Sequence, residues 1–587
     1  MKPKEWINKI FQTNKGCILI LVLLGLFIYI WSLPNEMFWD DDDFILKNRY
    51  IKEWQYFPQY FSQNLVAGAS LNSNYWRPLL LIVFASEWSL WKDWPPGWHS
   101  VNTAFHLADS VLLFFILLTI FRNRTLAFCT SLIFLTHPIQ VETVVYVNSL
   151  GDSLSVFFMF TSILLYLKFR LSNTNASLSP YYYIALATYP LALLSKESGI
   201  LLPAFIGICD FMLLDPKKTF LRRMIIIGRT IWPFALMALF YIYLRATKLN
   251  FINTFNFYDE NTEFTSNFWL RLINFFQVLQ IYFGLIFVPY DLRVERILEV
   301  PKTFFQPAVM FGSLVFSGMV SCAAYYWKRK PTITFGILWF FIGLILTSNL
   351  FVAINALVYE HFLYVPIIGI AVLLCWLVIH HLNSASLKNT ILKAFILLLI
   401  VYCGLSIKRV FEWRTAIGFY ENLIIHSPNS YRVINNLGME YADKNIHDKA
   451  EKYYLKAIAL DPKNPVAYHN IAGTYRDTGR TDLALQTFLK AVELDPKFIF
   501  SYKSIAQLYF LKKDYRNARA ALEEYFNRSD EKASTLESLI YIADLEHDLP
   551  ALQQYWQLAK AINPNDPAIQ MKLNSIEQEL NKTKRTQ

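Results

Sequence analysis

The first 410 or so residues are a series of long apolar runs separated by short polar segments. Most runs are roughly 18 to 23 residues long, which is enough for a helix to cross a bilayer. From Glu412 onward the sequence is charged and amphipathic, with a helical period. Charged residues make up 17% of the chain, whereas soluble domains typically carry about 25%. We therefore predict an all-α protein with a polytopic membrane domain followed by a water-soluble domain.

The charge balance and the cysteines exclude several functions. The chain has 55 Lys and Arg against 45 Asp and Glu, and in an apolar chain such an excess is typical of cytoplasmic loops rather than of nucleic-acid binding. The six cysteines lie singly in apolar stretches, without a CxxC pair or a His at ligand spacing. This pattern predicts neither a zinc site nor a disulfide framework.

The positions of the basic residues predict the topology. The run Gly16–Leu33 follows several lysines and has no cleavage pattern, so we expect an uncleaved anchor with a cytoplasmic N-terminus. The Trp-rich loop 35–99 is then expected on the outer face. The run Phe268–Pro289 carries a polar stripe of Arg271, Asn274, Gln277 and Gln280, which suits an interfacial or re-entrant helix, or a span that faces a wet cavity.

Whether the number of membrane crossings is odd or even depends on that polar run. About eleven to twelve spans are predicted. If Phe268–Pro289 does not cross, the C-terminal domain lies outside the cytoplasm, and if it does cross, that domain is cytoplasmic. We expect the first arrangement, in a bacterial inner membrane or the endoplasmic reticulum.

The soluble half contains an internal repeat. Asp461-Pro462 and Asp495-Pro496 recur at the 34-residue spacing of tetratricopeptide repeats. Small and large packing residues stand in register before each pair, such as Gly438 and Ala472. We predict a membrane domain over 1–410, a connector over 411–430, three clear repeats and one degenerate repeat over 431–570, and a polar tail over 571–587. Such helix pairs stack into a superhelix with a groove.

Several ionisable groups fall at the ends of apolar runs. Asp40-Asp41-Asp42-Asp43 follows the first span, and four adjacent carboxylates favour a bound cation or a shared proton. A solvated acidic turn is the alternative reading. Charged groups at membrane depth or at its edge are usually functional. The others are His137, Glu142, Asp152, Lys196, Glu197, Glu360 and His361.

These residues, taken in order, resemble a known family: the polytopic GT-C glycosyltransferases with C-terminal tetratricopeptide repeats, including the transmembrane O-mannosyltransferases and bacterial relatives. The matching segments are Trp39-Asp40-Asp41-Asp42 with Asn48, Tyr75-Trp76-Arg77-Pro78-Leu79, His99 with Asn102 and His106, His137-Pro138 with Glu142 and Asp152, Leu194-Ser195-Lys196-Glu197, Glu360-His361-Phe362-Leu363-Tyr364-Val365-Pro366, and Trp413. Two positions depart from the family, which usually has arginine before Asp152 and after Glu360. This chain has Leu150 and His361 there, and each change removes a permanent cation that could hold a phosphate.

The resemblance implies transfer of a sugar, such as mannose, from a polyprenyl-phosphate donor to a protein Ser or Thr hydroxyl on the non-cytoplasmic face. Asp41 or Asp40 is then the base of an inverting displacement. The expected substrate-binding residues are Arg77, His99, His106, His137, Glu142, Asp152, Lys196, Glu197, Glu360 and His361. A divalent cation on Asp42 and Glu142 is a further possibility. The repeats are expected to bind the polypeptide acceptor or another protein.

Two other classes of protein fit the same sequence. A noncatalytic membrane scaffold would use its repeats to recruit partners, and the acidic cluster would then tolerate substitution. A lipid-carrier flippase or polymerase would use similar spans, and a flippase would move the donor without forming a glycosylated product.

Overall fold

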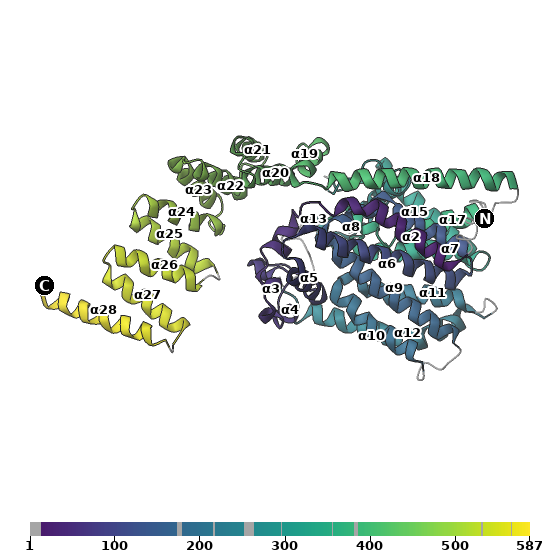
Figure 1. The fold of residues 1–587 in the computed structure, drawn as a ribbon, viewed down its shortest axis with the longest axis horizontal. Helices are drawn as coiled ribbons and strands as arrows, with labels where there is room; N and C mark the ends of the chain where they lie inside the picture. The colour runs from purple at the N-terminus through teal and green to yellow at the C-terminus, as the bar shows by residue number, and fades with distance from the viewer. Residues whose placement is uncertain are drawn as a thin grey trace. The chain divides into compact units, whose positions relative to one another are not determined.

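The structure is a computed structural model that describes residues 13–172, 179–214, 218–251, 263–294, 296, 298–354, 356–380, 385–529, 532–564 and 566–586. Its described residues form helices joined by turns and loops, without a strand (Figure 1). The all-α prediction is therefore confirmed. The chain divides into two compact units, Met1–Phe419 and Tyr420–Gln587. The division falls within the range predicted as a connector, 411–430, which is itself mostly helical.

Unit 1 is a bundle of apolar helices with a loop subdomain at one end. Its α-helices are α2 (Asn14–Tyr29), α3 (Arg49–Lys52), α4 (Gln59–Ser62), α5 (Pro78–Trp91), α6 (Pro95–Phe121), α7 (Arg124–Thr136), α8 (Val141–Val145), α9 (Leu150–Leu171), α10 (Pro180–Ser195), α11 (Leu202–Leu213), α12 (Phe220–Ala246), α13 (Glu263–Ser266), α14 (Phe268–Phe287), α15 (Pro307–Tyr326), α16 (Pro331–Leu344), α17 (Ile367–His380) and α18 (Ala385–Glu412). The helix α19 (Ala416–His426) follows and contains the boundary between the units.

The described residues include seven helices that are long and apolar enough to cross a membrane, or eight if α7 and the bent segment Pro138–Val145 form one broken span. Unit 1 is thus a multi-pass membrane domain, but the predicted count of eleven to twelve spans is not confirmed. Several predicted spans form shorter helices because prolines and charges interrupt them. The helix α10, for example, ends at Ser195 before Lys196, and a 3-10 turn at Glu197–Leu201 separates it from α11.

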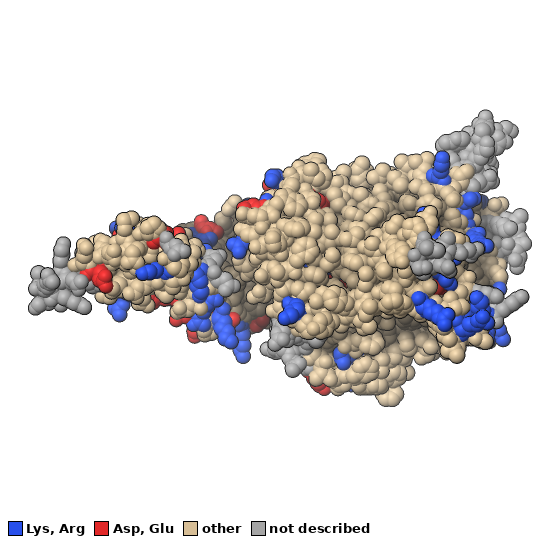
Figure 2. Space-filling model, turned by 90° about the horizontal axis from the view of Figure 1, so that it is seen from below, with Lys and Arg blue, Asp and Glu red and all other residues tan. Residues whose placement is uncertain are grey.

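The two ends of the bundle differ in charge. Arg124 at the start of α7 donates to Asn14 Oδ1 at the start of α2 (2.9 Å). At the other end of α2, Asn35 donates to the carbonyl of Val410 near the end of α18 (3.1 Å). Lys and Arg side chains gather at one end of the unit (Figure 2). We call the end that carries Asn14 and Arg124 the basic end, and the end that carries Asn35 and the loop 35–94 the loop end.

The polar run over 268–289 forms α14, a single helix that is long and apolar enough to cross a membrane. Near its C-terminus, the carbonyl of Ile286 bonds to His137, which follows α7. Near its N-terminus, Trp269 stacks on Phe304, just before α15 begins. The helix α15 then runs toward the basic end, where Trp327 packs on Phe220.

Unit 2 is a stack of antiparallel helix pairs. The pairs are α20 (Tyr431–Asp443) with α21 (His447–Leu460), α22 (Pro465–Asp477) with α23 (Thr481–Leu494), α24 (Phe500–Leu511) with α25 (Tyr515–Arg528), and α26 (Lys532–Leu545) with α27 (Leu549–Ile562). The predicted packing residues Gly438 and Ala472 are buried. A final helix, α28 (Pro567–Thr586), occupies most of the range predicted as a polar tail.

Candidate active site

The acidic segment forms a tight, irregular turn at the loop end. Trp39 has a left-handed backbone (φ 65°), and Asp42–Leu46 forms a single π-helical turn, a conformation that is frequent at functional sites. Asp41 is 2% exposed, and its Oδ1 accepts a hydrogen bond from the backbone N–H of Asn148 (2.9 Å). Burial raises the pKa of the Asp41 carboxyl well above its usual range. A carboxylate with a raised pKa is a stronger proton acceptor.

The four aspartates lie in different surroundings. Asp40, Asp42 and Asp43 are all half-buried, and Asp42 and Asp43 each lie 3.5 Å from Lys47 Nζ. Burial and the nearby carboxylates of Asp40 and Asp41 raise the pKa of the Tyr146 hydroxyl. The first two aspartates therefore face the interior of the site, and the last two form the outer ion pair of the turn.

An aromatic stack supports this segment from three parts of the chain. The ring of Trp39 stacks on Tyr146 at 5.3 Å, and Tyr146 stacks on Trp413 at 5.6 Å. Offset aromatic pairs of this kind each stabilise by about 0.5–1.5 kcal/mol beyond burial. The stack thus joins the acidic turn, the segment before α9 and the end of α18.

Arg77 and Glu197 form a nearly buried ion pair. Arg77 Nε and Nη2 donate to Glu197 Oε2 at 3.1 and 2.9 Å, and the guanidinium lies 4.6 Å from the centre of the Tyr75 ring. Burial alone would raise the pKa of Glu197, but Arg77 and Arg245 together lower it, so the carboxylate stays ionised. Tyr75 is also within electrostatic range of Asp40 and of the Tyr359 hydroxyl.

A second pair lies next to the first in the sequence. Lys196 Nζ donates to Asp152 Oδ2 at 2.6 Å, which joins the end of α10 to the first turn of α9. The carboxylate of Asp152 is within electrostatic range of Arg77. Gly151 lies against both pairs, since a Cβ built there would be in ordinary van der Waals contact with the carbonyl oxygen of Ser195 (3.4 Å) and with Arg77 Nη1 (3.9 Å).

A third charged group contains Glu360 and His361, two further residues predicted from the sequence. His361 Nδ1 lies 2.7 Å from Glu142 Oε1, and the imidazole stacks on the Tyr359 ring at 5.2 Å. Arg409 Nη2 donates to Glu360 Oε2 at 3.3 Å, and both side chains are buried. Because Tyr359 is close to both His361 and Tyr75, this group adjoins the Arg77 pair.

The three other predicted histidines are buried and make structural hydrogen bonds within the bundle. His106 lies 2.9 Å from the Tyr364 hydroxyl and 3.3 Å from the carbonyl of Leu135. His137 accepts from the Ile139 N–H (3.2 Å) and bonds the carbonyl of Ile286. Both ring nitrogens of His106 and His137 are thus occupied, so the predicted phosphate contacts are not available in this conformation.

His99 is also fully enclosed. Its Nε2 lies 3.1 Å from the carbonyl of Asn35, and the residue is 1% exposed. The bond fixes the segment that follows α2 to α6. This geometry is that of a positioning residue, and the structure shows no contact between His99 and the charged pairs of the site.

The residues named for a divalent cation are in separate ion pairs. Asp42 lies against Lys47, and Glu142 lies against His361. Within the described parts of the chain, no group of three or more His, Cys, Asp or Glu side chains is arranged to hold a metal ion. Asp42 and Glu142 therefore do not fit the predicted metal site.

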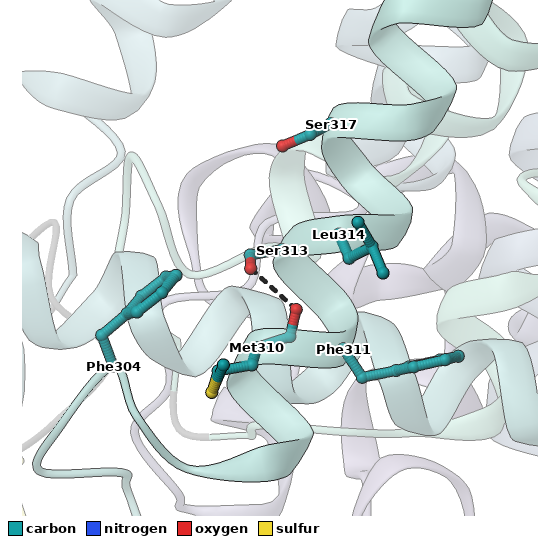
Figure 3. Close-up of a pocket in the computed structure, with 6 residues that line it drawn as sticks. All are labelled: Phe304, Met310, Phe311, Ser313, Leu314 and Ser317. Carbon is teal, nitrogen blue, oxygen red and sulfur yellow. Dashed lines mark hydrogen bonds between the residues drawn. The ribbon is translucent and has the colours of Figure 1, made fainter.

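An apolar pocket of about 430 Å³ lies on α15, and none of the charged residues described above lines it (Figure 3). It is lined by Phe304, Met310, Phe311, Ser313, Leu314 and Ser317. The Ser313 hydroxyl donates to the carbonyl of Met310 in the same helix (2.8 Å), as Figure 3 shows. The lining has no titratable group, and we assign it no chemistry.

Fold and site together define a multi-pass α-helical membrane protein with a tetratricopeptide-repeat domain and a charged centre at one end of its bundle. The tetratricopeptide repeat family matches residues 431–464 and 453–486. Among curated proteins, the chain is 25% identical to the protein O-mannosyl-transferase F38B6.6 of Caenorhabditis elegans, over 76% of this chain and 63% of that protein. It is 23% identical to the protein O-mannosyl-transferase TMTC4 of Homo sapiens, over 74% and 65%, and 25% identical to TMTC3 of Homo sapiens, over 66% and 45%.

The chain thus resembles the protein O-mannosyl-transferases with tetratricopeptide repeats, as predicted from its motifs. It spans less than two thirds of the length of these relatives. Among solved structures, that of MamA is 16% identical with a TM-score of 0.23, over 28% of this chain and 89% of that one.

Sequence reasoning missed several residues of the site. Arg409 and Arg296 lie near Glu360, Asn148 bonds Asp41, and Arg245 lies near Glu197. Arg409 and Arg245 had a detectable signal, since each is a cation at the very end of an apolar run. Asn148 contributes only its backbone N–H, which no side-chain motif identifies.

Proposed function

We propose that this protein is a membrane glycosyltransferase that moves a sugar, mannose by analogy with its relatives, from a polyprenyl-phosphate donor to a Ser or Thr hydroxyl of a protein. The proposal rests on one observation. Arg77 binds Glu197 at 2.9 Å and lies 4.6 Å from the centre of the Tyr75 ring, and Asp40 and Tyr359 are near enough to Tyr75 to affect its hydroxyl electrostatically, so carboxylates and cations from distant parts of the sequence converge at the loop end. A transferase of this type needs a base and an anion-binding group close together.

The chemistry is a single displacement with inversion. The carboxylate of Asp41 or Asp40 accepts the proton of the acceptor hydroxyl, and the hydroxyl oxygen forms a bond to the anomeric carbon. The bond from that carbon to the phosphate oxygen breaks, and polyprenyl phosphate leaves with the electron pair. Burial, which raises the pKa of Asp41, favours proton transfer to it.

Cations near Tyr75 hold the leaving phosphate in this proposal. Arg77 and Lys196 are the principal candidates because each has a carboxylate that orients it and each is only partly exposed. His361, oriented by Glu142, is a third candidate. These carboxylates keep the cations in place when the donor is absent.

We further propose that the loop end faces the non-cytoplasmic side. The basic end, with Arg124 beside Asn14, then faces the cytoplasm, as the distribution of Lys and Arg in membrane proteins favours. The backbone N–H of Glu36 bonds the carbonyl of Arg414 (3.0 Å), so the chain leaves unit 1 at the loop end. The repeats would then follow on the non-cytoplasmic side, where an extended acceptor polypeptide is available to them.

Donor turnover in membranes tests the base. We expect Asp40→Asn and Asp41→Asn to lower transfer from polyprenyl-phosphate mannose by at least about a hundredfold when the changed residue is the base. Asp43→Asn is the matched control, because Asp43 pairs with Lys47 and faces outward. Unchanged transfer by both the Asp40 and the Asp41 variants would remove these residues as the base.

Two measurements distinguish the alternative functions. A flippase would show donor movement in vesicles without a glycosylated product in detergent. A scaffold would tolerate both Asp variants, while changes on the inner faces of the repeats, for example at Asn435 or His469, would abolish its cellular function.

A further inference from the structure

Three polar residues near Arg77 have no part in the proposed chemistry: Tyr189 on α10, and Tyr241 and Arg245 on α12. Arg245 Nη1 donates to the carbonyl of Leu249 (2.8 Å), and Nη2 donates to the carbonyl of Asn74, three residues before Arg77. The end of α12 is therefore fastened to the segment that presents Arg77.

The two tyrosines carry buried hydroxyls that lack partners. Tyr241 is 7% exposed and its ring lies 6.2 Å from that of Trp76, beside Arg77 in the sequence. Tyr189 is completely buried. Among the described residues, neither hydroxyl has a hydrogen-bond partner. Burying an unpaired hydroxyl is unfavourable, so two of them at one place indicate that something else bonds them.

The same groups form one electrostatic cluster. Tyr241 is within range of Glu197, Arg245, Arg77 and Tyr189. Arg77 and Arg245 supply two positive charges and Glu197 one negative charge, so the cluster has one positive charge in excess. The neighbouring Lys196–Asp152 pair is balanced. In addition, Arg77 Nη1 has no acceptor among the described residues and lies beside Gly151, which has no side chain.

We infer that Arg245, Tyr241 and Tyr189 complete, with Arg77, a binding site for the singly charged phosphodiester of the lipid-linked sugar. A phosphodiester carries one negative charge, which balances the cluster, and its free oxygens accept bonds from the hydroxyls and guanidinium groups. A diphosphate link would leave a further negative charge unbalanced. The inference rests on the proposed function, since it identifies the ligand as the donor of that reaction.

The test is binding of polyprenyl-phosphate mannose to the full chain in detergent micelles without an acceptor. Arg245→Ala removes one charge-assisted contact and should raise the Kd at least about tenfold, whereas Tyr241→Phe should raise it about three- to tenfold. Arg245→Lys should recover part of the loss. The matched controls are Arg229→Ala and Tyr243→Phe, exposed residues of the same helix, which should leave the Kd unchanged.

Each outcome decides the assignment. Unchanged Kd values for both Arg245→Ala and Tyr241→Phe would overturn it, and the isosteric Tyr241→Phe keeps the test valid if Arg245→Ala fails to fold. Displacement of the donor by phosphatidylglycerol at equal concentration would overturn the donor assignment in favour of a headgroup site. Tighter binding of a diphosphate-linked sugar would overturn the charge argument.

Different experimental results would refute this inference and the proposed function. If the wild-type chain binds the donor through Arg245 but forms no glycosylated product, the transferase proposal fails and the binding site stands. If the wild-type chain transfers sugar and Arg245→Ala leaves both KM and Kd unchanged, only the binding site is wrong.

Discussion

The Arg77–Glu197 pair gives a prediction whose size follows from its burial. Removing one partner of a fully buried ion pair typically costs about 3–5 kcal/mol, because the other charge is left without compensation. The side chain of Arg77 is 9% exposed and that of Glu197 is 27% exposed, so water can solvate an unpaired Glu197 better than an unpaired Arg77. Glu197→Leu should therefore cost about 3 kcal/mol and Arg77→Met about 2 kcal/mol of unfolding free energy.

The double variant measures the interaction between Arg77 and Glu197 apart from their other contacts. With both charges gone, no uncompensated ion is left, and apolar replacement of a buried pair is often neutral. We expect Arg77→Met with Glu197→Leu to cost at least about 1 kcal/mol less than the sum of the single changes. The measurement is unfolding of the full chain in mixed micelles, followed by tryptophan fluorescence at neutral pH.

The pH dependence of the unfolding free energy shows whether Glu197 stabilises the fold in its ionised form. The pKa of Glu197 is lowered in the folded state, so its stabilising contribution is fully present above the unfolded pKa of about 4.3 and is lost as the pH falls through the lower folded value. Wild type should lose this contribution only in strong acid. Single changes that each cost less than about 0.5 kcal/mol, or costs that simply add in the double variant, would refute the reasoning.

Three further predictions concern the base, the repeats and the topology. Because the pKa of Asp41 is raised, transfer that uses it as the base should rise with pH through a pKa above the ordinary aspartate value of about 3.9; a rate that is flat between pH 4 and 8 would contradict this role. Gly438→Ala places a Cβ 2.7 Å from the Tyr454 ring and should destabilise the repeats by about 1–3 kcal/mol, whereas Gly473→Ala meets no atom within 4 Å and should stabilise by about 0.5–1 kcal/mol; equal thermal shifts would exclude the clash. A protease added to the outside of sealed vesicles with the cytoplasmic face inside should cleave the repeats, and full protection would place them in the cytoplasm.

The general architecture could be predicted because it depends on local sequence. Apolar runs long enough to span a bilayer must form helices there, since their backbone groups have no other partners. The 34-residue period likewise predicted the helix pairs and the burial of Gly438 and Ala472. The span count was harder, because breaks such as the one at Lys196 divide apolar runs into short helices whose crossing depends on neighbouring helices.

The candidate site was only partly accessible to sequence reasoning. Its ionisable residues were identified because charges at the ends of apolar runs are costly to place without a use. Their partners were not, because Arg77 and Glu197 are 120 residues apart and His361 and Glu142 are 219 apart. The sequence alone also treated His106 and His137 as equal to His361, although the fold encloses the first two and leaves the third half-buried.

The sequence by itself determined that one half of the chain lies in a membrane and the other in water, that both halves are helical, and which charged residues matter. These properties follow from the length of the apolar runs and from the repeat period, which are local features of the sequence. Only the tertiary structure decided which charges meet, which histidines have free nitrogens and which hydroxyls lack partners. Those properties arise from packing between helices that are distant in the chain, where a shift of a few ångströms decides whether a polar group is paired, buried or open to a ligand.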